Sequence, residues 1–296
     1  MNPKIVIGTW PMSGDYGKVQ ISELQKIIDK CSVNGYHEFD TAPNYGKGLS
    51  ELLIGNFFPN EVLVNTKVGN SVTNKKNFNP SSMLIGFSES LKRLKKEKIN
   101  CLFLHNPRSE IDNYEAIFEF ADKLKEEDQI NEFGISTAKS YDYNEDVIKQ
   151  FDSIQFDYNL LYIQDYVKYK NLNLKKYIRS PLASGLLTGK INTHTKFSGS
   201  DHRSLWLIGK RLESINYRIK YLLETLNINR DMLIHYAKSF VLSNPKVDKA
   251  IFGVRRGDHI NIFNDDLIKI SSKKIVEIER LNLNNFYLNE KQYSGY

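Results

Sequence analysis

Cysteine is scarce in this chain, and long apolar runs are missing. The 296 residues include 2 cysteines, Cys31 and Cys101, which are far apart and form no C-x-x-C spacing. This scarcity excludes a disulfide framework and a thiolate zinc site, and it favours a reducing compartment. No stretch approaches the roughly 20 apolar residues that cross a bilayer. Since residues 1–7 also lack the apolar core and cleavage site of a signal peptide, we expect a cytoplasmic protein without a membrane partner.

Sequence motifs of several other protein classes are missing as well. No G-x-G-x-x-G follows a predicted strand, which disfavours a Rossmann dehydrogenase, and no G-x-x-x-x-G-K-[ST] indicates an NTPase. No His/Glu cluster suggests a metal site. The net charge of +6 lies largely in Lys clusters on predicted solvent faces, such as residues 92–96, with no basic stripe interleaved with aromatics. We therefore expect neither a bound metal nor a nucleic-acid partner.

Short apolar runs of strand length alternate with longer segments of helical periodicity over most of the chain. This order is typical of βα units and a parallel sheet. Eight candidate strands are present, the number that closes an α/β barrel of roughly 250 residues or more. They are Lys4–Thr9, Glu38–Ala42, Val62–Lys67, Cys101–Asn106, Glu132–Ser136, Ser153–Asn159, Tyr177–Leu182 and Lys249–Val254. We predict a single α/β domain over residues 1–296, a (β/α)8 TIM barrel with a tail at about 284–296.

Helix signals occupy the segments between these strands. Ser22 is a predicted N-cap, Gly35 ends the same helix, and Pro80 opens another. After the seventh strand, residues 183–211 form a long loop rich in Gly, Ser, Thr and His, which is typical of binding loops. Extra helices follow this loop. The remaining predicted helices lie at 114–128, 212–226, 230–243, 260–267 and 273–281.

Polar side chains gather at the C-terminal ends of the predicted strands, where barrel enzymes assemble their sites. Asp40, Lys67 and His105 end three neighbouring strands, and Tyr45 follows Asp40 directly. An isolated tyrosine has a pKa of about 10. We expect Lys67 to lower that pKa and Asp40 to keep the ammonium charged, so that Tyr45 can protonate a carbonyl oxygen oriented by His105. Taken singly, each residue is better explained by a structural role, and only the four together favour catalysis.

A series of short motifs runs in one order along nearly the whole chain. The first are I-G-T-W at 7–10, F-D-T-A-P-N-Y-G at 39–46, N-T-K-V-G at 65–69 and L-H-N-P at 104–107. The later ones are F-G-I-S-T at 133–137, I-Q-F-D-Y-N at 154–159, R-S-P-L-A-S-G-L-L-T-G-K at 179–190 and F-G-V-R-R at 252–256. This ordered series resembles the aldo-keto reductase family. The resemblance implies an NAD(P)H-dependent oxidoreductase that reduces an aldehyde or ketone, a sugar or other polar carbonyl included, to an alcohol.

The resemblance also implies roles for individual residues. Tyr45 would be the proton donor of a catalytic set completed by Lys67, Asp40 and His105. Ser136 and Gln155 would hydrogen-bond the nicotinamide carboxamide. The implied cofactor-binding residues are Thr9, Trp10, Asp40, Ser136, Gln155, Arg179, Ser180, Leu182, Gly185, Gly253, Val254, Arg255, Arg256 and His259. The expected substrate pocket comprises Trp10, Tyr16, Tyr45, His105 and Trp206, although Trp206 is equally compatible with an anchor for its loop.

The cofactor segments depart from the family pattern at several positions. Thr137 replaces the usual Asn, and Arg179 stands where an aromatic ring commonly stacks on the nicotinamide, so that a planar guanidinium adds positive charge there. His259 stands where Gln or Arg is usual, and Phe263 where Asn often contacts adenine, with Asn264 adjacent.

Two consecutive arginines bear on the choice of coenzyme. Arg255 and Arg256 favour NADPH over NADH, because guanidinium groups bind phosphate in a forked geometry. The alternative is that one arginine is solvated and the other pairs with Asp258.

Two other functions stay open besides a reductase. The altered cofactor contacts suit a non-catalytic, cofactor-binding regulatory subunit of the same fold, and a lyase of barrel fold would share the polar strand ends. The complete set of Asp40, Tyr45, Lys67 and His105 favours the reductase. We expect a small-molecule carbonyl as the partner, and a monomer or a small homo-oligomer.

Overall fold

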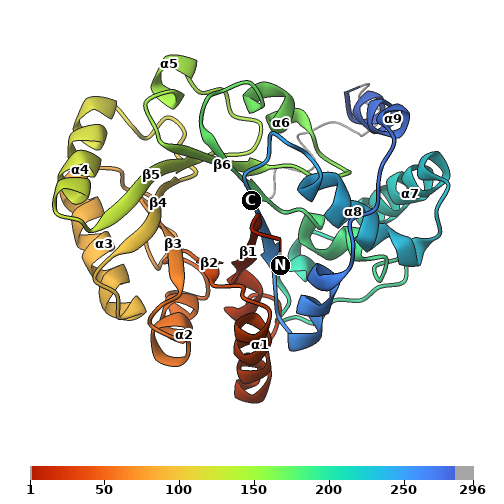
Figure 1. Ribbon diagram of the computed structural model, residues 1–296, viewed down its shortest axis with the longest axis horizontal. Helices are drawn as coiled ribbons and strands as arrows, with labels where there is room; N and C mark the ends of the chain where they lie inside the picture. The colour runs from red at the N-terminus through yellow and green to blue at the C-terminus, as the bar shows by residue number, and fades with distance from the viewer. Residues whose placement is uncertain (1, 284–296) are drawn as a thin grey trace.

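Eight parallel strands close into a barrel, and helices surround it (Figure 1). The computed structural model describes residues 2–283, so Met1 and the predicted tail at 284–296 lie outside the described residues. The strands follow one another in chain order, and the last pairs with the first. The predicted TIM barrel is thereby confirmed. The strands are β1 (Ile5–Gly8), β2 (Glu38–Asp40), β3 (Leu63–Val68), β4 (Ile99–His105), β5 (Ile130–Ser136), β6 (Ser153–Asp157), β7 (Lys175–Arg179) and β8 (Lys249–Gly253).

Helices connect successive strands along most of the chain. The α-helices are α1 (Ile21–Val33), α2 (Leu49–Phe57), α3 (Pro80–Leu94), α4 (Tyr114–Glu126), α5 (Glu145–Ile148), α6 (Gln164–Tyr169), α7 (Gly209–Leu226), α8 (Leu233–Leu242) and α9 (Ser272–Leu283). The 3₁₀ helices are η1 (Trp10–Met12), η2 (Ala183–Thr188), η3 (His202–Leu205), η4 (Arg230–Met232) and η5 (Gly257–Asn264). Within residues 2–283, none of the helices is both long and apolar enough to span a membrane.

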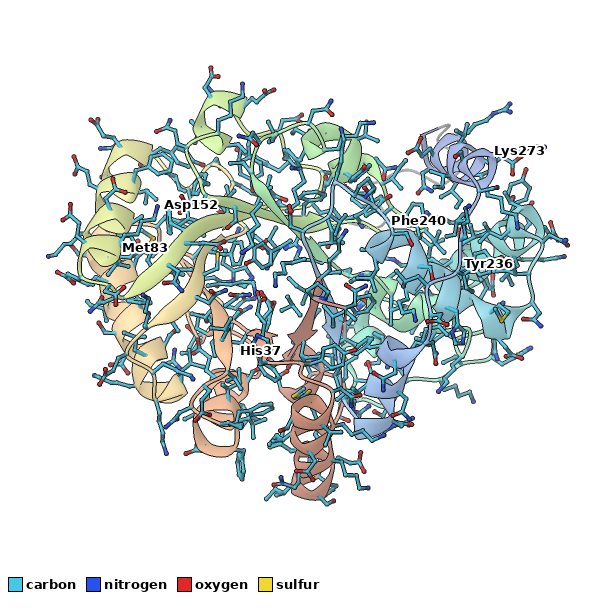
Figure 2. All side chains as sticks on the ribbon, viewed as in Figure 1. His37, Met83, Asp152, Tyr236, Phe240 and Lys273 are labelled. Atoms are coloured by element: carbon cyan, nitrogen blue, oxygen red, sulfur yellow. The ribbon has the colours of Figure 1, made fainter. Side chains whose placement is uncertain are left out.

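Two apolar layers hold the barrel together. Side chains alternate between the two faces of a strand, so each strand contributes to both layers. The inner cluster draws on four strands and consists of Val6, Cys101, Phe103, Tyr177 and Ile251. The side chains that alternate with these along each strand point outward and pack against the helices. The buried side chains of this outer layer include Met83 of α3 and Phe240 of α8, both labelled in Figure 2. The opening that the ribbon leaves inside the ring of strands is filled by side chains (Figure 2).

Several helix boundaries differ from the prediction, including one cap and one helix type. The N-cap position of α1 is Gln20, which is still extended, so Ser22 lies in the first turn and the predicted Ser22 cap is wrong. The predicted α-helix at 260–267 is instead the 3₁₀ helix η5, which begins three residues earlier. Pro80 does open α3, where the Asn79 side chain caps the helix by accepting from the Ser81 N–H at 3.0 Å.

Candidate active site

A buried ion pair stands at the C-terminal ends of β2 and β3. Lys67 Nζ lies 2.7 Å from Asp40 Oδ1 and also donates to the Thr41 carbonyl at 2.7 Å. Burial by itself lowers the pKa of a lysine, but the attraction of Asp40 and Tyr45 more than offsets it, and the pKa of Lys67 lies above its usual value. Lys67 is therefore a fixed cation inside the mouth of the barrel.

Tyr45 lies in the turn after β2, with its ring centre 4.9 Å from Lys67 Nζ. The turn passes close to the Ser13 carbonyl, where a Cβ on Gly46 would come within 2.3 Å of the oxygen, and Gly46 adopts a φ of 57°. Burial raises the pKa of Tyr45, and the nearby Lys67 opposes this only in part, so the pKa of Tyr45 lies above its usual value. The predicted net lowering is wrong because burial outweighs the neighbouring cation. At neutral pH the phenol keeps its proton.

His105 ends β4 and turns its imidazole toward Tyr45. The two rings meet edge to face, with their centres 6.2 Å apart. Burial, reinforced by the positive charges of Lys67 and Arg179, holds the pKa of His105 well below its usual value, so the ring is neutral. Its Nδ1 is buried and has no hydrogen-bond partner among residues 2–283. All four residues of the predicted catalytic set therefore meet at one end of the barrel.

A chain of hydrogen bonds connects Asp40 with the far side of the mouth. Gln155 Nε2 donates to Asp40 Oδ2 at 2.9 Å, and Ser136 Oγ donates to Gln155 Oε1 at 2.9 Å. Ser136 and Gln155 are thus brought to the site as expected, but their side chains also bond to each other. Both oxygens of Asp40 are engaged, since Oδ1 accepts from Lys67.

Arg179, at the end of β7, joins this network with its guanidinium. It donates to Ser136 Oγ at 3.1 Å, to Asn106 Oδ1 at 2.9 Å and to the Thr137 carbonyl at 2.8 Å. Its Nε lies 3.2 Å from the carboxylate of Asp157, its partner in register on β6. Arg179 is therefore a hydrogen-bonded part of the mouth rather than a solvated surface cation.

Trp10 forms an aromatic wall beside the phenol. Its indole stacks on Tyr45 with the ring centres 5.8 Å apart, and its Nε1 donates to Asp15 Oδ2 at 2.7 Å. Thr9 precedes it, but the Thr9 hydroxyl donates to the Asp40 carbonyl at 2.9 Å and lies 2.6 Å from Ser50 Oγ. Thr9 thus supports β2 from within.

The loops after β1 and β7 are joined across the mouth. Tyr16 and Asp201 form an isolated β-bridge, and the His202 N–H donates to the Asp15 carbonyl at 2.7 Å. The His202 ring centre lies 5.1 Å from that of Trp10, 5.8 Å from that of Tyr16 and 6.0 Å from that of Trp206. His202 therefore connects the predicted substrate residues, although no motif pointed to it.

The backbone after β7 is strained where a pyrophosphate is expected. Ser180, Ala183 and Ser184 adopt positive φ values of 53°, 47° and 55°, and Gly185 follows with 91°. A non-glycine residue in this region costs about 1–3 kcal/mol, and such residues cluster at ligand sites. This strained segment fits a bound dinucleotide. Leu182 lies in the same turn, and its carbonyl accepts a hydrogen bond from the Gly185 N–H at 2.9 Å.

The predicted adenosine end lies after β8. Gly253 ends β8 and Val254 follows it, and the Val254 N–H donates to the Gly8 carbonyl at 3.1 Å. Arg256 binds Asp258 through two hydrogen bonds of 2.9 and 2.6 Å, which is the alternative considered for one of the two arginines. Arg255 extends to the Lys18 carbonyl at 3.4 Å instead.

The remaining residues after β8 pack against the barrel. The Arg255 N–H lies 3.4 Å from Nδ1 of His259, and Phe263 is buried against Phe252 with the ring centres 5.1 Å apart. Phe263 is therefore a core residue.

Asp157 and Asn106 are not among the site residues predicted from the sequence, although both lie inside the motifs. Asp157 could have been predicted from its position at a strand end, two residues after Gln155. There it meets Arg179 across β6 and β7. Asn106 follows His105 directly, so its side chain also belongs to the mouth.

Comparison with known proteins gives a consistent result. The model of the Aldo/keto reductase family matches residues 4–283. This chain belongs to that family. It is 24% identical to a probable voltage-gated potassium channel subunit beta of Oryza sativa, covering 91% of this chain and 89% of the relative. It is 25% identical to an aldo-keto reductase of Bacillus subtilis, covering 88% and 84%.

Solved structures of the same family share the fold. A glycerol dehydrogenase from Gluconobacter oxydans superposes with a TM-score of 0.74 at 22% identity, covering 95% of this chain and 93% of that one. The holo form of an aldo-keto reductase from Bacillus halodurans gives 0.71 at 21% identity, covering 94% and 91%.

Proposed function

We propose that this family member is an NAD(P)H-dependent reductase of aldehydes or ketones in which Tyr45 donates the proton. The observation that carries the proposal is the convergence of a neutral phenol, a buried cation, its carboxylate partner and a neutral imidazole. The bound coenzyme supplies a hydride to the carbonyl carbon. The carbonyl oxygen becomes a hydroxyl by taking its proton from Tyr45, so that one hydride and one proton convert C=O into CH–OH.

The protein groups act on the oxygen of the substrate. The Tyr45 hydroxyl and His105 hydrogen-bond that oxygen from two directions and fix its position. As the proton leaves, negative charge develops on the phenol, and Lys67 stabilises it at short range. Asp40 keeps Lys67 charged and holds it in place through the 2.7 Å contact.

The residues around the mouth would hold the coenzyme. Ser136, Gln155 and Arg179 surround the nicotinamide position, and the strained segment 180–185 suits the pyrophosphate. Arg255 supports NADPH as the preferred coenzyme, with NADH as an alternative, because its guanidinium is not held by a carboxylate in the way that Arg256 is.

The aromatic wall supports a small carbonyl substrate. The rings of Trp10, Tyr16 and Trp206 gather around His202, and Asp15 adds a carboxylate that already accepts from the Trp10 indole. Flat aromatic faces beside a carboxylate suit a sugar or another polar carbonyl, and the glycerol dehydrogenase of similar fold acts on a polyol. We expect a monomer or small homo-oligomer in the cytoplasm, where the free, buried thiols of Cys31 and Cys101 stay reduced.

A coenzyme-absorbance assay tests the proposal directly. Native protein is screened with NADPH and NADH against aldehydes, ketones and sugars, and Tyr45→Phe is compared on the best substrate. We expect Tyr45→Phe to lower turnover roughly 10²–10⁴-fold, the usual contribution of a general acid, with coenzyme affinity unchanged. Tyr217→Phe on α7, an exposed tyrosine, is the matched control and should behave as native protein. Equal turnover in both variants would remove Tyr45 from the mechanism.

A non-catalytic regulatory subunit is the second candidate. The relatives from rice and Arabidopsis thaliana, each 24% identical, are named as probable channel subunits and favour it. The same assay separates the two. Tight coenzyme binding without turnover on any carbonyl would support the regulatory subunit, whereas turnover that depends on Tyr45 supports the reductase.

A further inference from the structure

Arg179 places a second buried cation near the proposed reacting centre. Its guanidinium donates to Asn106 Oδ1 at 2.9 Å and to Ser136 Oγ at 3.1 Å. Asn106 directly follows His105, and Ser136 is the Cα partner of His105 across β4 and β5. Two of its hydrogen bonds thus tie Arg179 to the immediate neighbours of the catalytic imidazole.

The charge of Arg179 reaches both groups that would hold the substrate oxygen. Burial raises the pKa of Tyr45, and the charges of Lys67 and Arg179 act against that increase. In His105, burial and the same two cations all lower the pKa. Both groups therefore lie within the electrostatic reach of Arg179.

Asp157 balances this cation from one side. It binds the Nε edge of Arg179 at 3.2 Å from the adjacent strand β6. The two terminal nitrogens of Arg179 instead point toward β4 and β5, where they meet Asn106, Ser136 and the Thr137 carbonyl. The ion pair is therefore oriented, with its positive end toward the reacting centre and its negative end held at β6.

We propose that the Arg179–Asp157 pair makes this site discriminate between the redox states of its coenzyme, binding the reduced form more tightly than the oxidised form. The inference rests on the proposed function, because hydride transfer to a carbonyl held by Tyr45 and His105 requires the nicotinamide ring beside them. That ring carries a positive charge only when it is oxidised. A fixed cation facing the ring opposes the oxidised form and leaves the neutral, reduced ring nearly unaffected.

The orientation of the pair has a consequence for turnover. Reduction of a carbonyl leaves the oxidised coenzyme in the site, where Arg179 now opposes it. The product coenzyme is released more readily, and the reduced coenzyme that replaces it is preferred. At equal concentrations of the two forms, a larger share of the protein therefore holds the reduced coenzyme.

The test is the ratio of two dissociation constants, NADP⁺ over NADPH, measured without substrate by fluorescence titration. We expect Arg179→Gln to lower this ratio roughly five- to tenfold, because the remaining Asp157 attracts the oxidised ring. Asp157→Asn should raise the ratio by a similar factor, since it leaves Arg179 unbalanced. Lys92→Gln removes an exposed cation on α3 and serves as the control, with a ratio within about twofold of native protein.

Opposite shifts in the two variants separate a charge effect from damage to the fold. Lost packing weakens both forms of the coenzyme alike and leaves the ratio unchanged. Ratios that stay within twofold of native protein in both variants, or that move in the same direction, would overturn the inference while leaving the reductase proposal intact. Native protein that binds neither form would overturn the reductase proposal, and this inference with it.

Discussion

Removing one partner of the Lys67–Asp40 pair is expected to cost far more stability than removing both. At the observed 2.7 Å, the gross attraction of the two charges is about 6 kcal/mol at an effective dielectric constant of about 20. Desolvation of two buried ions offsets most of this attraction. Asp40→Asn, however, leaves Lys67 charged and buried, with the Thr41 carbonyl still 2.7 Å from its Nζ, and breaking a buried pair in this way costs about 3–5 kcal/mol.

Thermal unfolding of four proteins measures this effect. They are native protein, Asp40→Asn, Lys67→Met and the double variant. We expect each single variant to unfold about 5–15 °C lower than native protein, and the double variant to unfold at a higher temperature than either single variant. Lys92→Met removes an exposed pair with Glu89 and should leave the unfolding temperature close to that of native protein, which makes it the surface control. Additive losses in the double variant would refute the reasoning, since two groups that stabilise each other cannot contribute independently.

Two further predictions concern pH and coenzyme choice. Burial, reinforced by Asp157, raises the pKa of Asp165 from 3.8 to about 6, so the folded chain holds this proton more tightly than the unfolded chain. The resulting stabilisation, at most about 3 kcal/mol, is complete below pH 3.8 and is lost as the pH rises through about 6. In Asp165→Asn, the midpoint of urea unfolding should change less with pH across this range than in native protein. An unaltered pH dependence would contradict the assignment. Separately, Arg255→Ala should weaken NADPH roughly tenfold while sparing NADH, and Arg256→Ala should act less because Asp258 already holds that guanidinium. Equal losses for both coenzymes in a binding titration would place the phosphate elsewhere.

The barrel was predictable from the sequence because its signal is repeated. Every predicted strand overlaps an observed one, since each has buried residues on both faces and a turn or helix start behind it. The N-cap of α1 was not predictable with the same accuracy. The cap is the last residue whose backbone is still extended, and the sequence does not show that this residue is Gln20 rather than Ser22. Local patterns specify an element better than its first residue.

The candidate site was predictable in its membership but not in its internal bonding. The strand ends place Asp40, Lys67 and His105 at one mouth, which follows from a parallel barrel alone. The direction of the pKa shift of Tyr45 could not be predicted without knowing how deeply the side chain is buried, and no motif contains that information. The ion pair between Arg179 and Asp157 could not be predicted without the register of β6 against β7, and this register depends on the closed sheet as a whole.

The bridge between Tyr16 and Asp201 restricts how this scaffold can acquire new specificities. In many barrels each loop varies independently, so that substrate range changes by replacing one segment at a time. Here the segment that carries Trp10 and the segment that carries His202 share backbone hydrogen bonds, and a graft of either one alone leaves its counterpart without a partner. Directed evolution of this protein should therefore exchange the two segments as a unit.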